Sequence, residues 1–584
     1  MYLSPEERAV GQENFCAAMG SPHLRREFLL KGIKAAVASG KGLGPMYFGY
    51  DDQLSEPVRV GVIGTGDEGS VLIGAINPKF IAVKAIADIR PYSVYRAFHG
   101  EVDVEARRGL MAVYDWKSED EARKHVKVYS AYQELIEKAK DEGIEAVIIA
   151  LPLHLHAPAA IAAMKAGLHV ITEKLMGHSV RECKEMARVA KQTGRHLATG
   201  HQRHYSILYD HAVYAIEQGL LGQLHYIRAQ WHRGNLPGTD SWQMPMPKEI
   251  KPEDRQAKRL DDELKKLQDA LKDAEKTASP SEVELLKKRI AQKEAQIADY
   301  VLKDSAKNYG YQDMQIKDGK GKVVYDRPAA EELLRWRLWD RTGAGLMAEL
   351  GSHQLDAASI FISAMHGGVK QHPLSVCAAA NRPLFPPDRD VEDHVYCVFE
   401  FPAPGYRDPE KPEHILDPNK KIGVQYSSIN GNGFGGYGEI VFGTEGTLLL
   451  ETEKDVLLFK CADTAGKTKV TMAQRPGHGE ASPMLAVDAA GDDESAAIGQ
   501  LGTLPAKRGY TEELEHWAWC IRNPAPENQP RCHPKVAMGD AVIALTTNRA
   551  ARHGARIEFK EDWFDSDSDE TPEGEKPDIT RYNA

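Results

Sequence analysis

Short apolar runs alternate with amphipathic stretches through residues 57–200. Four runs have the length and β-branched content of buried strands, and two stretches have helical periodicity. Buried strands that alternate with helices predict an α/β fold, with a parallel sheet covered by helices on both faces. The strands are expected at residues 58–63, 81–87, 146–150 and 169–172, and the helices at 157–166 and 179–193.

The pattern changes after residue 200, where longer strand-like runs follow one another and one helical stretch covers residues 345–364. This succession predicts a second, α+β domain over residues 201–560, with a large open and mostly antiparallel sheet. An open sheet often supplies a contact between subunits, so we expect a homo-oligomer, either a dimer or a tetramer. The strands are expected at residues 224–232, 374–381, 394–401, 421–430, 438–442 and 447–453.

Residues 252–303 differ from both domains. Apolar side chains recur at four-three spacing on either side of Ser279-Pro280-Ser281-Glu282, a capping-box pattern with proline in the first helical turn. The segment is therefore predicted to be an antiparallel helical hairpin inserted into the second domain. Its narrow apolar seam can be buried within the hairpin itself. Two interpretations remain: a solvated decoration, or a lid or oligomer contact.

The two ends of the chain carry unlike signals. Within residues 1–56, Leu24-Arg25-Arg26-Glu27-Phe28 resembles a twin-arginine export signal, but lysines interrupt the apolar stretch that should follow. Two interpretations of this segment remain. It is either the degenerate export signal of a periplasmic protein, or an arm of a cytoplasmic protein that packs on its own folded chain or on a neighbouring subunit. Residues 561–584 are acidic and predict a solvated, disordered tail.

Length and charge narrow the classes of protein. A chain of 584 residues is too long to fold around a single hydrophobic core, so two large domains are expected. Its 85 acidic and 74 basic residues leave a formal net charge of −11, which argues against a nucleic-acid or anionic-membrane partner. No apolar run approaches the roughly 18 residues of a transmembrane helix. The scattered cysteines show no ligand spacing, so no metal centre is expected.

The turn after the first strand, residues 64–69, has the sequence GTGDEG and opens a helix. In this GxGxxG pattern Gly64 permits a tight turn, Gly66 lets the backbone approach a pyrophosphate, and Gly69 allows close helix–strand packing. Asp88 ends the next strand, where its carboxylate can bind the adenosine ribose and repel a 2′-phosphate. We therefore predict a Rossmann domain that binds NAD, while Arg90 leaves NADP possible. The expected cofactor residues here are Gly64, Thr65, Gly66, Asp67, Glu68, Gly69, Asp88 and Arg90.

Two further clusters of candidate ligand-binding residues, at 151–156 and at 173–174, come directly after predicted strands. Ligands of such sheets lie at the carboxyl ends of the strands, so these loops should border the nicotinamide half of the cofactor. In the second cluster Glu173 can bind ribose hydroxyls, and the Lys174 ammonium can hydrogen-bond a substrate hydroxyl. The first cluster contributes the expected cofactor contacts Leu151, Pro152, His154 and His156.

The order of these motifs resembles that of the Gfo/Idh/MocA oxidoreductases, the group of glucose–fructose oxidoreductase and inositol dehydrogenase. The motifs are, in turn, GxGxxG, an acid after the second strand, Pro-x-His-x-His and Glu-Lys-Leu. The resemblance covers residues 57–245 and 330–560 and includes Gln202 among the cofactor residues. Leu175 departs from the usual Glu-Lys-Pro. Because that proline shapes the turn rather than reacting, the role implied for Lys174 stands.

The family's second catalytic element is an acid four positions before a histidine on a helix. Glu349 and His353 match it, and a spacing of four places both on one helical face. Glu349 replaces the usual aspartate, so its reach differs by one methylene, which bears on the substrate more than on the reaction. Alone the pair would suit a surface helix, but after the Rossmann motifs it completes the catalytic set Lys174, His353 and Glu349.

Tryptophan, arginine and histidine are dense before this helix. Tryptophan rings can cover the apolar faces of sugars, and arginine and histidine can bind their hydroxyl groups, so this composition suits a carbohydrate pocket. The alternative interpretation is that these tryptophans belong to the hydrophobic core. The expected substrate residues are Arg203, Tyr205, His232, Trp336 and Asp356.

The leading hypothesis is hydride transfer between a sugar or polyol carbon and nicotinamide. Either His353 or Lys174 takes the hydroxyl proton, and Glu349 orients the pair. One alternative is a glycosidase that uses NAD transiently, oxidising a hydroxyl to allow elimination of the aglycone; the motifs do not separate it from a dehydrogenase. The other is a non-catalytic NAD-binding regulator, which the presence of Lys174 and His353 argues against.

Overall fold

The computed structural model describes residues 3–20, 44–461, 469–474, 483–487 and 508–582. The segment that resembles an export signal lies outside these residues. Within them, no helix is both long and apolar enough to span a membrane.

The first sheet is six-stranded and parallel throughout. Its central strands are apolar and buried on both faces, as a sheet covered by helices requires. The helices α4 (Asp67–Ala75), α5 (Pro91–His99), α9 (His156–Lys165) and α10 (Val180–Thr193) connect successive strands. The predicted α/β fold is thus confirmed. The strand order is β3 (Lys127–Tyr129), β2 (Ile81–Ala87), β1 (Val58–Ile63), β4 (Ala146–Ile149), β5 (His169–Glu173) and β6 (Leu197–Gly200).

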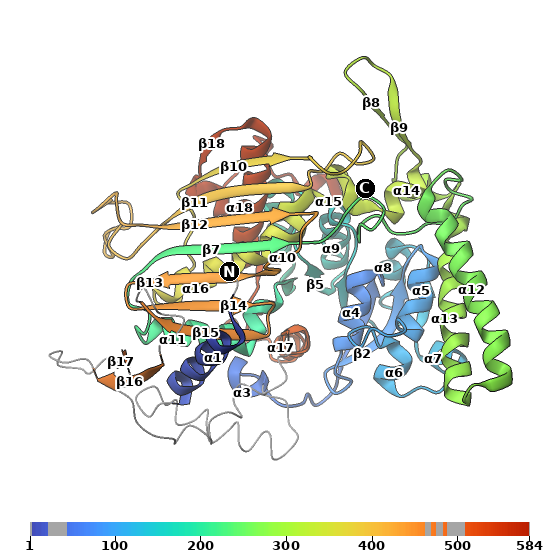
Figure 1. Cartoon of the computed structure of the whole chain (residues 1–584), viewed down its shortest axis with the longest axis horizontal. Helices are drawn as coiled ribbons and strands as arrows, with labels where there is room; N and C mark the ends of the chain where they lie inside the picture. The colour runs from blue at the N-terminus through green and yellow to red at the C-terminus, as the bar shows by residue number, and fades with distance from the viewer. Residues whose placement is uncertain (1–2, 21–43, 462–468, 475–482, 488–507, 583–584) are drawn as a thin grey trace.

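The second sheet has eight strands and is antiparallel except for the pair β7–β12 (Figure 1). Helices α11 (Ile207–Glu217), α16 (Ser352–Ala364) and α18 (Pro534–His553) pack together on one face. The other face exposes Tyr396 and Val398, and the expected homo-oligomer stays a prediction. The strand order is β15 (Asp455–Lys460), β14 (Gly446–Glu451), β13 (Tyr437–Gly443), β7 (Leu224–His232), β12 (Lys421–Ile429), β11 (His394–Pro402), β10 (Ser375–Asn381) and β18 (Arg556–Glu558).

Shorter elements complete the fold. Helix α17 (Tyr510–Arg522) comes between β15 and β18 of the second sheet in the chain, yet its Leu514 and Trp517 belong to the core of the first sheet. Further short helices are α3 (Gly44–Phe48), α6 (Gly109–Tyr114), α7 (Glu119–His125), α8 (Tyr132–Lys138), α14 (Ala329–Leu334) and α15 (Asp340–Gly343), and β8 (Met314–Lys317) pairs with β9 (Val323–Arg327).

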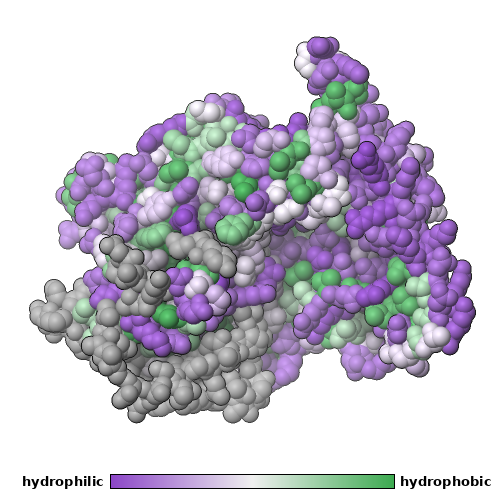
Figure 2. Space-filling model, viewed as in Figure 1, coloured by the Kyte–Doolittle hydropathy of each residue, from purple (hydrophilic) through white to green (hydrophobic). Residues whose placement is uncertain are grey.

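The predicted helical hairpin is confirmed as α12 (Arg255–Thr277) and α13 (Pro280–Ala298). Ser279 caps α13, where its Oγ accepts a hydrogen bond from the Glu282 N–H at 3.3 Å. The hairpin lies along the Rossmann domain, with α13 packed on α5 (Figure 1). Its outer surface is largely hydrophilic (Figure 2).

The N-terminal helix α1 (Pro5–Gly20) packs on β15 of the same chain, as one of the two interpretations of residues 1–56 requires. The Asn14 amide donates to the Leu458 carbonyl at 3.1 Å, and Phe15 is buried. Residues 470–474 and 483–487 pair as strands β16 and β17, although most of this region has the composition of a loop.

The prediction of a disordered acidic tail is wrong for residues 561–582. Helix α19 (Glu561–Phe564) buries Trp563 and Phe564. The Lys184 ammonium is buried on α10 and donates to the carbonyl oxygens of residues 562, 568 and 570 at 2.6, 3.0 and 2.7 Å. A buried cation needs acceptors, and the tail backbone supplies them. Composition alone does not reveal this because the anchoring lysine lies in another domain.

Replacing Lys184 by methionine should release the tail. Three carbonyls lose a charged donor, so we expect the free energy of unfolding to fall by about 2 kcal/mol or more, and the tail to become sensitive to protease. Thermal denaturation and limited proteolysis measure both effects. Lys191→Met is the control, because Lys191 on the same helix makes only an exposed pair with Asp567. Equal effects of the two variants would contradict the anchoring role.

Candidate functional site

A cavity of about 1160 Å³ lies at the carboxyl ends of the first sheet's strands, where the second domain faces them. Parallel sheets bind their ligands at this edge. The expected residues that line it are Gly64, Gly66, Asp67, Glu68, Asp88, Arg90, Leu151, Pro152, His156, Glu173, Lys174, Trp336, Glu349 and His353.

The glycine turn is built for close approach. Gly64 has φ of +83°, and a Cβ there would lie 2.4 Å from the Ala150 carbonyl oxygen. A Cβ on Gly69 would lie 2.1 Å from the Gly64 oxygen. At Gly66 the nearest atom would be 3.9 Å away, so a side chain there would project into the open cavity. The turn therefore leaves a cradle at the N-terminus of α4, where a pyrophosphate fits.

Asp88 is fixed by backbone donors at the end of β2. Its Oδ2 accepts from the Thr65 N–H at 2.8 Å, and its Oδ1 accepts from the Arg90 N–H at 2.9 Å. Burial raises the pKa of Asp88 against the effect of these bonds. The carboxylate is thus held at the position that binds an adenosine ribose in such domains.

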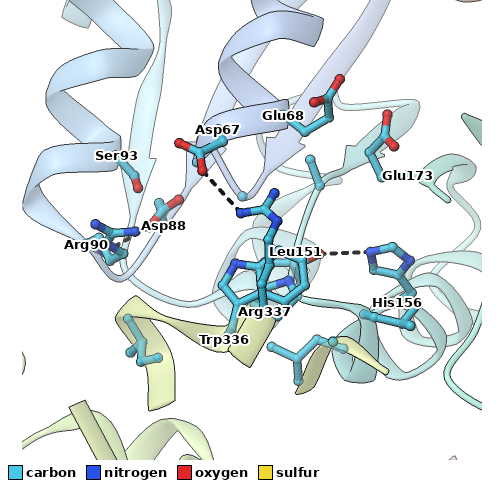
Figure 3. Close-up of a pocket in the computed structure, with 18 of the residues that line it drawn as sticks. Asp67, Glu68, Asp88, Arg90, Ser93, Leu151, His156, Glu173, Trp336 and Arg337 are labelled. Carbon is cyan, nitrogen blue, oxygen red and sulfur yellow. Dashed lines mark hydrogen bonds and ion pairs between the residues drawn. The ribbon is translucent and has the colours of Figure 1, made fainter. Parts of the chain in front are cut away.

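The N-terminus of α4 already carries two acids, Asp67 and Glu68. Burial alone would raise the pKa of Asp67, but arginines hold it well below its usual range. Arg96 lies 2.9 Å from Asp67 Oδ1, and Arg337 of the second domain lies 3.2 Å from Oδ2. Figure 3 shows Arg337 reaching Asp67 from beside Trp336, whose ring centroid is 4.3 Å from the guanidinium carbon. These cations make the turn compatible with a bound pyrophosphate.

The acid of the second domain lies beside Lys174. The Lys174 Nζ donates to the Glu349 carbonyl oxygen at 2.7 Å and lies 3.8 Å from Oε2, while Arg337 Nε donates to Oε1 at 2.7 Å. Burial would raise the pKa of Glu349, but Arg337 and then Lys174 lower it to about 2. Glu349 belongs to a π-helical turn, Met347–Gly351, rather than the regular helix expected. Such turns are frequent at functional sites.

His353 follows on α16, and its ring centroid is 5.5 Å from that of Trp231. Burial and then the Lys174 charge lower its pKa well below the usual value, so the imidazole is neutral near pH 7 and can accept a proton. Its backbone is fixed from outside the cavity, because Arg203 donates to the His353 carbonyl oxygen at 2.6 Å.

Two acids in the cavity wall have unused oxygens. Glu173 Oε1 and Glu68 Oε1 are buried and have no hydrogen-bond partner among the described residues. Burial and then the charge of Glu68 raise the pKa of Glu173, so this carboxyl tends to hold its proton. Such groups fit the hydroxyl groups of a cofactor ribose, which would satisfy them.

Eight expected residues lie outside the cavity lining. Arg203 is buried between Glu439 and Glu453, at 2.9 and 2.8 Å. The Tyr205 hydroxyl contacts His516 at 2.8 Å, and His232 lies in a separate groove on the sheet. The other five are Thr65, Gly69, His154, Gln202 and Asp356.

Asp356 belongs to a buried cluster with His201 and Asp540. His204 Nε2 lies 2.8 Å from Asp356 Oδ1, and the Lys370 ammonium donates to Asp540 Oδ1 at 2.7 Å. His201, Asp356 and Asp540 have the geometry to offer one ligand atom each to a metal ion. The Lys370 ammonium already supplies a cation here. No metal centre is expected from the sequence, because the cysteines show no ligand spacing and these three residues lie far apart in the chain.

Several cavity residues were not expected from the motifs. Arg96 and Arg337 balance Asp67, and Arg233 lies with Trp231 and Trp242 in the half of the wall formed by the second domain. The Arg233 guanidinium carbon is 5.7 Å from both tryptophan rings. The density of tryptophan and arginine in the sequence indicates this region, but it does not predict which of these side chains face the cavity.

The fold and the glycine turn define a dinucleotide-binding protein whose second domain forms part of the cavity wall. Residues 58–201 match the model of the oxidoreductase family with an NAD-binding Rossmann fold, GFO_IDH_MocA. The first domain thus matches the NAD-binding domain of this family, and the resemblance drawn from the motifs is confirmed over these residues.

Curated relatives resemble part of the chain. It is 30% identical over 210 residues to a glycosyl hydrolase family 109 protein of Stenotrophomonas maltophilia, covering 35% of this chain and 41% of that protein. It is 29% identical over 217 residues to an alpha-N-acetylgalactosaminidase of Shewanella oneidensis, covering 36% and 44%. The chain therefore spans less than half the length of these relatives.

Among solved structures, the aldose-aldose oxidoreductase from Caulobacter crescentus superposes with a TM-score of 0.47 at 15% identity, over 86% of this chain and 100% of that one.

Gly66→Ala should separate cofactor binding from folding. The added methyl meets no protein atom closer than 3.9 Å but projects toward the pyrophosphate. We expect the melting temperature to be unchanged and NADH affinity to fall roughly tenfold or more, measured by nicotinamide fluorescence. Gly69→Ala is the matched comparison, because its methyl meets backbone and should lower the melting temperature. Unchanged NADH affinity in Gly66→Ala would place the pyrophosphate elsewhere.

Proposed function

We propose that this protein is an NAD-dependent oxidoreductase that acts on a hydroxylated carbon of a sugar or polyol. The observation that carries the proposal is the convergence of Lys174, Glu349 and His353 on the cavity of the glycine turn. The first residue comes from the Rossmann domain and the other two come from the second domain. Three tryptophans and Arg233 in the same wall suit a ring with apolar faces and hydroxyl groups.

The proposed mechanism divides the work among these three side chains. Bound NAD supplies the hydride acceptor. His353, neutral near pH 7, takes the hydroxyl proton as the carbon loses its hydride, so an alcohol becomes a carbonyl. The Lys174 ammonium hydrogen-bonds the same oxygen and stabilises its negative charge as the proton leaves. Glu349 fixes the position of Lys174 through its carbonyl oxygen and through its ionised carboxylate, whose Oε2 lies 3.8 Å from the Lys174 Nζ.

This assignment chooses between the two candidate bases. We assign His353 as the base because it lines the cavity as a neutral imidazole, and one nitrogen of such a ring can accept a proton. The Lys174 Nζ is directed instead to Glu349, where it donates to the carbonyl oxygen at 2.7 Å and lies 3.8 Å from Oε2.

A second candidate is a glycoside hydrolase that oxidises a sugar hydroxyl transiently and eliminates the aglycone as the neighbouring C–H loses its proton. Water then adds to the resulting double bond, and the hydride is returned. The observation that favours it is the similarity to proteins named as glycosyl hydrolases. The same three side chains would serve the oxidation step. Release of nitrophenol from nitrophenyl glycosides without net NADH favours the hydrolase, whereas net NADH with free sugars or polyols favours the dehydrogenase.

Lys174→Met and His353→Asn test the assigned roles. With the substrate found in that screen, we expect turnover to fall by roughly 10²–10⁴-fold, the usual contribution of acid–base catalysis. NADH affinity should change little, because neither side chain lies at the pyrophosphate or adenosine end. His232→Asn is the control, since His232 lies in a separate groove. Full turnover by His353→Asn would refute its role as base.

Arg337→Gln should shift the pH dependence of turnover. The folded-state pKa of Glu349, about 2, lies below the ordinary glutamate value of about 4.3. Its ion pairs therefore stabilise the fold above that ordinary value, and this contribution is lost as the pH falls toward 2. Without Arg337 the pKa of Glu349 rises, so kcat at saturating NAD should decline at a higher pH than in the wild type.

The control for this profile is Arg552→Gln, because Arg552 pairs with Asp340 away from the cavity. If kcat declines at the same acidic pH in the wild type and in Arg337→Gln, ionised Glu349 is not required for turnover.

A further inference from the structure

The hairpin insertion reaches the adenosine end of the cavity. Asp299 directly follows α13, and its side chain is only 2% exposed. Its Oδ2 accepts from Arg90 Nε at 3.0 Å and from Arg90 Nη2 at 2.9 Å, while its Oδ1 accepts from the Tyr92 N–H at 3.0 Å. Further along the same segment, residues 308–311 line the cavity.

Arg90 occupies a position that bears on the choice of cofactor. It lies two residues after Asp88, and an arginine at this place in a Rossmann domain can bind the 2′-phosphate that distinguishes NADP from NAD. In this structure Arg90 Nε and Nη2 are both directed to Asp299. Asp299 therefore neutralises the cation and also adds a second carboxylate near Asp88.

Other polar contacts fix the hairpin in this position. The Val102 N–H donates to Gln292 Oε1 at 3.0 Å, and Gln292 Nε2 donates to the Tyr92 hydroxyl at 3.3 Å. Arg289 pairs with Asp103 at 2.5 Å. Asp299 is thus delivered to Arg90 by a docked element rather than by a free loop.

We infer that Asp299 is a specificity-determining residue, and that the insertion makes the site selective for NAD over NADP by holding Arg90 away from the ribose 2′ position. This inference rests on the proposed NAD-dependent function, because it concerns the same site. Asp299 acts through Arg90 and is a positioning residue. It gives the hairpin a role that neither a solvated decoration nor an oligomer contact would have.

The test is the ratio of NADPH to NADH affinity in the full chain, measured by nicotinamide fluorescence. Asp299→Asn keeps the size of the side chain and removes its charge. We expect NADPH affinity to rise about tenfold or more, the effect of one charged hydrogen bond, with NADH affinity within about threefold. Asp299→Glu restores the carboxylate and should keep the wild-type preference.

Two variants separate this role from a loosened hairpin. Arg289→Gln breaks the contact with Asp103 and should leave the ratio unchanged. Asp299→Asn combined with Arg90→Met should lose the gained NADPH affinity. Arg90→Met alone should leave NADPH affinity as weak as in the wild type, and this variant tests the inference even if Asp299→Asn does not fold.

An unchanged ratio in a folded Asp299→Asn would overturn the inference, as would weaker NADPH binding in Arg90→Met alone. Both outcomes presuppose that the wild type binds NADH. If the wild type binds neither nucleotide, the proposed function fails instead, so the two failures are distinguishable.

Discussion

The site depends on the Arg337 guanidinium, which pairs with Asp67 of the glycine turn and Glu349 of the π-helical turn. Each acid is largely shielded from water, and an unpaired charge in such a place is costly. One cation therefore links the two domains, while each acid also has a second cation beside it, Arg96 at Asp67 and Lys174 at Glu349. Stacking of Arg337 on Trp336 fixes its direction, so the position of Glu349 follows from the geometry of the glycine turn.

Local patterns predicted most of the fold. The bounds of β1, β2 and β7 follow from runs of apolar and β-branched residues, and the hairpin follows from its apolar spacing and the Ser279 cap. The glycine turn and Asp88 were also predictable, because all their constraints lie within one βαβ unit. The parallel β7–β12 pair was not, since it joins strands that are nearly 200 residues apart in the chain and is set by tertiary packing.

The candidate site was only partly predictable. Lys174, Glu349 and His353 follow from motifs, whereas Arg203 and Asp356 carry similar signals and lie outside the cavity lining. Arg203 meets Glu439 and Glu453, and Asp356 meets His204, and none of these pairs can be read from spacing. A buried charge is directed by partners that are distant in sequence, so residue type and local context cannot tell a ligand-binding arginine from one that holds the domain together.

The anchored tail has a consequence for how the chain is made. The Lys184 ammonium on α10 finds its first tail acceptor 378 residues later. While the ribosome is still synthesising the second domain, helix α10 therefore carries a cation whose native acceptors do not yet exist. The Rossmann domain can complete its own packing only after residues 562–570 have been made. A chain that stops short of residue 562 would retain the whole glycine turn, but Lys184 would lack the carbonyl acceptors and the tail residues that bury it.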